Sequence, residues 1–147
     1  MKKAIAVLFV FVLVIAISVP CFAVNDIAPK SVSYVTLPSI SIIEFYGASG
    51  HEYSINVNTD YVGFNRITTG DPVSLCQAYT LITGGGLTDD DVDGIWGVKS
   101  DTALRTAQGI LGNVYSVVTA DGVCGPNTWK AFYGYNGGTP QSLKNLL

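Results

Sequence analysis

The stretch Asp93-Gly94-Ile95-Trp96-Gly97 returns 28 residues later as Asp121-Gly122-Val123-Cys124-Gly125. Each copy starts with an acid and a glycine, ends with a second glycine, and precedes a segment with the apolar periodicity of a helix. Gly94 and Gly122 can supply the positive φ angle that a tight turn requires. The repeat predicts two similar turn-to-helix units packed into one small domain.

Helical segments flank both turns. A first helix opens at Asp71-Pro72, where Asp71 serves as N-cap and the proline fits the first turn, and it stops at Gly84. A second helix is capped by Ser100 or Asp101 and stops at Gly112. Both helices carry apolar residues along one face, which predicts that they pack against a shared core.

The chain before the first helix is β-rich. Alternating or β-branched and aromatic residues occur between turn signals in residues 31–37, 40–46, 53–58 and 61–67. The fold class is therefore α+β, with a β-rich segment at 24–69 and a helical domain at 70–133. That domain closes with a helix at about 127–133, and the tail, 134–147, has room for a short helix. Whether the strands pack on the helices or form a loose extension is open.

The N-terminus has the pattern of a cleaved secretory signal over residues 1–23. Lys2 and Lys3 precede an apolar run of 16 residues, and Ala23 is a small residue at the expected cleavage site. The alternative is a membrane anchor, but this run is short for a span of about 20 residues. We expect a secreted protein that keeps no stable membrane anchor after cleavage.

Cleavage would leave 124 residues with six basic and eleven acidic side chains, a net charge of about −5. Since no basic stripe survives, nucleic acid is not an expected partner. Cys76 and Cys124 also remain, an even number in an exported chain, which favours a disulfide. Two buried free thiols are the alternative.

Three motifs stand in order along residues 70–133. They are Gly70-Asp71-Pro72-Val73-Ser74-Leu75-Cys76-Gln77, Val92-Asp93-Gly94-Ile95-Trp96-Gly97 and Ala120-Asp121-Gly122-Val123-Cys124-Gly125-Pro126-Asn127-Thr128-Trp129. In this order they resemble the motifs of the peptidoglycan-binding-domain family. The resemblance implies a compact three-helix bundle that binds peptidoglycan, through its glycan or its stem peptide, in a shallow groove near the Asp-Gly turns. Cys76 and Cys124 replace residues that the family buries, which supports a disulfide inside the core.

The candidate ligand-binding residues lie in and beside the two turns. The tryptophan rings could stack on sugar faces, and the amides could bond N-acetyl groups or peptide stems. Each candidate also has a structural explanation, because aspartates bond their own turns, tryptophans fill cores and amides cap helices. The candidates are Asp93, Gly94, Trp96, Asp121, Gly122, Asn127 and Trp129, with Gln108 and Thr128 as further amide and hydroxyl donors.

Groups for catalysis are sparse. His51 is the only histidine, it falls in a predicted turn, and both cysteines lie in the other half of the chain. We therefore expect no enzyme, no cofactor and no metal. Residues 89–94 begin like a calcium loop, but its twelfth position is Ser100 rather than an acid, so calcium binding stays open.

By this resemblance, the expected function is that of a secreted, non-catalytic peptidoglycan-binding protein that localises to the cell wall. One alternative is a structural or interaction protein that reuses the same scaffold, with its β-rich segment adding a strand to a protein partner. Another is an accessory subunit or inhibitor of a separate cell-wall hydrolase.

Overall fold

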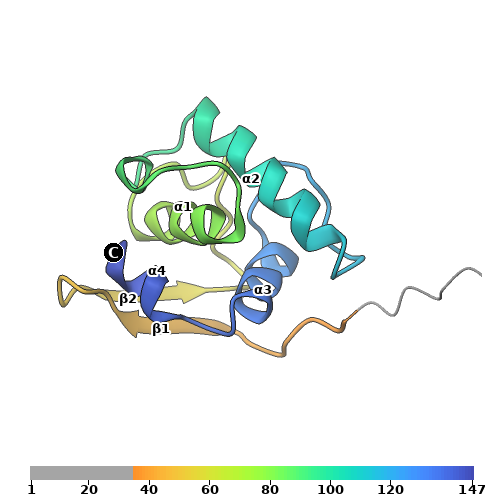
Figure 1. Ribbon diagram of the computed structural model, residues 1–147, viewed down its shortest axis with the longest axis horizontal. Helices are drawn as coiled ribbons and strands as arrows, with labels where there is room; N and C mark the ends of the chain where they lie inside the picture. The colour runs from red at the N-terminus through yellow and green to blue at the C-terminus, as the bar shows by residue number, and fades with distance from the viewer. Residues whose placement is uncertain (1–34) are drawn as a thin grey trace, which may run out of the picture. The chain divides into compact units, whose positions relative to one another are not determined.

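Figure 1 shows a computed structural model, which describes residues 35–147. The predicted signal peptide lies outside the described residues. A two-stranded sheet and helices confirm the α+β class. The elements are β1 (Ile42–Tyr46), β2 (Glu52–Asn56), α1 (Asp71–Thr83), the 3-10 helix η1 (Asp89–Asp91), α2 (Val98–Gly112), α3 (Pro126–Tyr135) and α4 (Gln141–Asn145).

The strands β1 and β2 form an antiparallel hairpin that belongs to the core. Phe45 lies opposite Tyr53, and their rings stack with centroids 5.2 Å apart. Ile43 and Ile55 point inward and are buried. Figure 1 shows α1 between this hairpin and α2, and α1 contacts both. The hairpin therefore packs on the helices and is not a loose extension.

Of the three or four expected strands, two form within the described residues. Residues 35–37 have no regular structure, and 31–34 lie outside the described residues. Residues 61–67 form isolated bridges instead of a strand, in which Val62 pairs with both Ile67 and Cys124. Val62 and Gly63 are buried and residues 64–66 are exposed, so burial in this segment does not alternate as it would along a strand.

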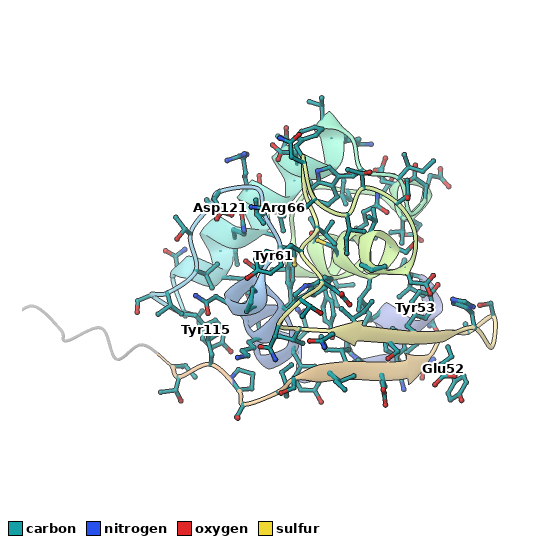
Figure 2. All side chains as sticks on the ribbon, turned by 180° about the vertical axis from the view of Figure 1, so that it is seen from behind. Glu52, Tyr53, Tyr61, Arg66, Tyr115 and Asp121 are labelled. Carbon is teal, nitrogen blue, oxygen red and sulfur yellow. The ribbon has the colours of Figure 1, made fainter. Side chains whose placement is uncertain are left out.

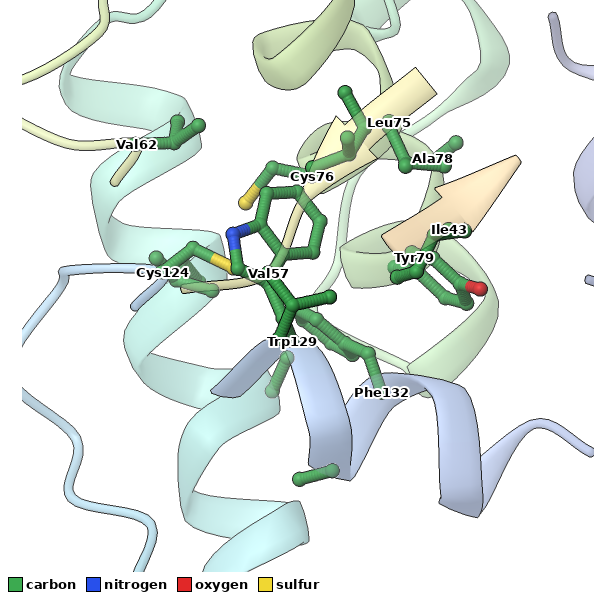
Figure 3. Packing of buried hydrophobic residues seen from close by; sticks show 14 of the residues in the cluster. Ile43, Val57, Val62, Leu75, Cys76, Ala78, Tyr79, Cys124, Trp129 and Phe132 are labelled. Atoms are coloured by element: carbon green, nitrogen blue, oxygen red, sulfur yellow. The ribbon is translucent and has the colours of Figure 1, made fainter. Parts of the chain in front are cut away.

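The helices meet over a core of aromatic and aliphatic side chains, shown in Figure 3. Tyr79 of α1 stacks on Phe132 of α3 with ring centroids 5.4 Å apart. The Tyr79 hydroxyl donates to the carbonyl of Gly138, so the buried polar group has a partner. Trp129 and Leu104 are completely buried beside them.

Two predicted helix caps are wrong. Gly70, not Asp71, is the N-cap of α1, and Asp71 instead lies 2.9 Å from Nε2 of His51 at the hairpin turn. Helix α2 begins at Val98, directly after the extended Gly97. Ser100 is therefore inside the helix, where its buried hydroxyl serves a different partner. The predicted stop of α1 at Gly84 is confirmed, with φ of 95°.

Candidate functional site

The first Asp-Gly turn is held by Gln77, a buried side chain of α1. Its Oε1 accepts a hydrogen bond from the Gly94 amide at 2.9 Å. Its Nε2 lies 2.9 Å from Oδ1 of Asp93 and 3.0 Å from the Ile95 carbonyl. The Ser100 hydroxyl lies 3.1 Å from the same nitrogen. One glutamine thus satisfies polar groups from the whole turn.

The second turn repeats this arrangement around Gln108 of α2. The Gly122 amide donates to its Oε1 at 2.9 Å. Its Nε2 reaches Oδ1 of Asp121 at 3.0 Å and the Val123 carbonyl at 2.9 Å. Thr128 takes the place of the serine, at 3.2 Å. The sequence repeat is therefore also a repeat of hydrogen bonds. The amide of Gln108 bonds to other groups of the protein rather than to a ligand.

The four predicted turn residues shape the turns. Asp93 and Asp121 each use Oδ1 to accept the backbone amide two residues later, at 2.9 Å in both turns. Hydrogen bonds from Gln77 and from that amide lower the pKa of Asp93. Gly94 and Gly122 have φ of 70° and 74°, which a side chain would strain. Within the described residues, nothing donates to Oδ2 of Asp121.

A single segment, residues 60–69, joins both turns, and we call it the bridging segment. Val62 and Cys124 exchange backbone hydrogen bonds of 3.1 and 2.9 Å at the second turn. The Trp96 amide donates to the Thr68 carbonyl at 2.8 Å at the first turn. Both turns therefore gain backbone partners from a part of the chain that precedes α1.

The two tryptophans belong to the core. Trp129 is completely buried, and its Nε1 donates to the carbonyl of Asp60 in the bridging segment at 2.6 Å. Trp96 is 7% exposed. Because protein covers these rings, neither offers a face for a sugar, and the core explanation holds for both. Replacing Trp96 would disturb the packing of the core, so weaker binding by such a variant would not identify a ligand contact.

A shallow hollow of about 310 Å³ lies beside the second turn, and we call it the turn groove. Its volume is at the lower end for small-ligand sites. Two of the predicted site residues, Asp121 and Asn127, line it. Its full lining is Tyr61, Val117, Thr119, Asp121, Val123, Gly125, Pro126 and Asn127.

Tyr61 contributes an aromatic wall that the sequence motifs did not indicate. It is 38% exposed, and its ring packs so closely on Gly125 that a Cβ there would lie 2.9 Å from it. The guanidinium carbon of Arg66 lies 5.8 Å from the ring centroid, at cation–π distance. Figure 2 shows Tyr61 and Arg66, both from the bridging segment, near Asp121 of the second turn, which comes much later in the sequence.

Cys76 and Cys124 lie side by side in the core. Both are completely buried and are free thiols in this structure. The two cysteines approach each other to 3.7 Å. Burial, followed by the hydrogen bond with Cys76, raises the pKa of Cys124. A disulfide has a sulfur–sulfur bond of about 2.05 Å, so the expected bond is absent here and stays a prediction.

Two carboxylates of the acidic loop, those of Asp91 and Asp93, bond to other groups of the protein. Asp91 pairs with Lys99 at 2.6 Å, and Asp93 bonds within the first turn. Across residues 35–147, no three acidic, histidine or cysteine side chains gather in a way that could hold a metal ion. The contacts of this loop therefore give no support to calcium binding.

The ion pair of the acidic loop should respond to acid. Hydrogen bonds from Lys99 and then from the Thr88 amide and hydroxyl lower the pKa of Asp91 from 3.8 to about 2. Because the folded pKa lies below the ordinary one, the stability that Asp91 contributes is present above about pH 4 and is lost as the pH falls through about 2. We expect NMR to show Asp91 titrating near pH 2, and Asp91→Asn to lose stability less steeply in acid. A midpoint near 4 would contradict the pairing.

Comparisons of the chain with family models, with curated proteins and with solved structures find no match. The likeness to the peptidoglycan-binding-domain family therefore rests on the sequence motifs. Within the described part of the chain, no helix is both long and apolar enough to cross a membrane.

Proposed function

We propose that this protein is an exported, non-catalytic binder of cell-wall peptidoglycan and that it holds the wall in the turn groove. The observation that carries the proposal is the position of this groove, on the second Asp-Gly turn where the motif resemblance is densest. Tyr61 is 38% exposed and lines the groove, and we expect the C–H groups of a sugar to stack on its ring. Asp121, Thr119 and Asn127 add polar side chains to the same lining.

The rigid turn favours binding because little has to be ordered when a ligand arrives. Gln108 and the bridging segment hold the second turn from two sides. Preorganised polar groups lose less conformational entropy on binding than mobile ones. A modest groove can therefore give useful affinity, especially for a polymer that presents many copies of one unit.

The residues that follow the two turns differ, and this difference is why the second turn is the proposed binding site. With the repeat spacing of 28 residues, Val98 and Lys99 after the first turn correspond to Pro126 and Asn127 after the second. Lys99 is bound to Asp91, and Val98 is 75% exposed. The amide of Asn127 instead lines the turn groove. The two turns share a backbone arrangement but present different surfaces.

A pull-down with purified insoluble peptidoglycan tests the proposal. We expect the chain from residue 24 onward to bind saturably and to be displaced by soluble wall fragments. Tyr61→Ala should weaken binding about tenfold, because it removes the stacking face. Tyr46→Ala is the matched control, since Tyr46 is 62% exposed on the hairpin, outside the groove. Equal pelleting of wild type and Tyr61→Ala would count against the groove.

A second candidate function, binding of a protein partner, is favoured by the outward face of the hairpin. Ile42 and Tyr46 are 53% and 62% exposed there, on either side of Glu44. Exposed apolar residues on a strand suit strand addition. A separate wall hydrolase is one such partner. On this alternative, Tyr46→Ala abolishes the interaction and Tyr61→Ala leaves it unchanged.

A further inference from the structure

A second hollow, of about 430 Å³, continues from the turn groove, and we call it the apolar groove. The two hollows share Val117 and Asn127. The lining of the apolar groove is Val35, Thr36, Leu37, Ser116, Val117 and Asn127. Neither tryptophan takes part, and the groove draws on a part of the chain outside the resembled motifs.

The walls of the apolar groove are tied to the fold, and no other described residue covers them. The Val35 amide donates to the Val114 carbonyl at 3.1 Å, which ties one wall to the segment between α2 and α3. Val35 and Val117 nevertheless remain 57% and 54% exposed. These side chains leave apolar surface in water, and a ligand that covered it would gain free energy.

Asn127 stands at the junction of the two hollows. Its Nδ2 donates to the Val117 carbonyl at 3.2 Å, which orients the amide. Its Oδ1 accepts no hydrogen bond from the described residues and is free for an N–H of a ligand. An amide N–H is the natural donor at a point where a sugar joins a peptide.

We propose that the two hollows form one site for a sugar unit that carries a short peptide with small apolar side chains. The sugar lies on Tyr61 in the turn groove, and the peptide runs past Asn127 onto Val35 and Val117. This inference rests on the proposed function and adds that the conjugate, rather than glycan or peptide alone, is the ligand. The polar half suits the sugar, and the apolar half suits methyl groups of the peptide.

The conjugate should bind far more tightly than its parts, because joining two weakly bound groups makes the second contact intramolecular. Isothermal titration calorimetry would compare three probes: the N-acetylglucosamine–N-acetylmuramic acid disaccharide, its stem tetrapeptide, and the disaccharide carrying that tetrapeptide. We expect the conjugate to bind at least tenfold more tightly than either part. Equal affinity of the bare disaccharide and the conjugate would overturn the inference.

Two variants separate the halves of the site. Val35→Asp should weaken conjugate binding about tenfold and leave disaccharide binding within twofold, since Val35 lines only the apolar groove and the change places a charge there. Tyr61→Ala should weaken the disaccharide and the conjugate alike. Val98→Asp is the control for an added charge, because Val98 is an exposed valine beside the first turn. Circular dichroism and thermal melting would check that each variant is folded.

The outcomes also separate this inference from the proposed function. If the wild-type protein does not bind insoluble peptidoglycan, both the proposed function and this inference are overturned. Retained wall binding with no effect of Val35→Asp overturns only the two-part site and leaves the turn groove as a sugar site. Wall binding that Val35→Asp abolishes while Tyr61→Ala does not would mean that the peptide alone is recognised, and this too overturns the inference.

Discussion

Replacing Gln108 by leucine should lower the free energy of unfolding by about 3 to 4 kcal/mol. The side chain of Gln108 is 1% exposed and bonds the Gly122 amide, the Val123 carbonyl and the Asp121 carboxylate. Leucine fills a similar volume but leaves the buried Gly122 amide without a partner, which costs about 1 to 3 kcal/mol. It also removes the hydrogen bonds to the Val123 carbonyl and to Asp121, each of which contributes about 0.5 to 1.5 kcal/mol. Urea denaturation followed by circular dichroism would measure the loss.

The duplication provides an internal check on this result. Gln77→Leu should cost a similar amount, because Gln77 makes the same set of bonds at the first turn. Gln141→Leu is the control, since Gln141 is an exposed residue of α4 and should change stability by no more than about 0.5 kcal/mol. If all three variants were equally stable, the glutamines would not hold the turns.

Oxidation of Cys76 and Cys124 to a disulfide should stabilise the protein by about 4 kcal/mol. The cysteines are 48 residues apart, and closing a loop of this length restricts the unfolded chain. For a domain of this size the gain corresponds to a rise in Tm of roughly 10 to 20 °C. Their distance of 3.7 Å means that little movement is needed to form the bond. Calorimetry with and without reductant would measure the shift.

The double variant Cys76→Ala, Cys124→Ala provides the control for oxidation. Its Tm should be independent of reductant, and lower than that of the oxidised wild type because two buried side chains become smaller. Alkylation in denaturant would count the free thiols directly. Two free thiols after exposure to oxidised glutathione, with an unchanged Tm, would contradict the disulfide.

The sequence predicted the features that depend on neighbouring residues. The glycine positions of the two turns, the stop at Gly84 and the hairpin at about residues 40–58 all follow from local rules, and the structure contains each of them. The helix starts were less accurate. Ser100 looked like a cap because serine often caps helices, but Gln77 reaches it from another helix, and sequence alone does not reveal that contact.

The candidate site was only partly predictable for the same reason. Asp121 and Asn127 lie within the motif and do line the turn groove. Tyr61 reaches it from 60 residues earlier in the chain, through the pairing of Val62 with Cys124. The sequence did not decide whether Trp129 packs in the core or binds a ligand, because a tryptophan near a turn has the same local pattern in either role. Only its bond to Asp60 and its burial decide between them.

The bridging segment has a consequence for the order in which the chain can fold. Residues 60–69 emerge from the ribosome early, yet Val62 pairs with Cys124, and Asp60 accepts from Trp129. Contacts this distant in sequence close late and slow folding. The core thus cannot form until synthesis passes Trp129, so a nascent chain shorter than this stays open and accessible to chaperones.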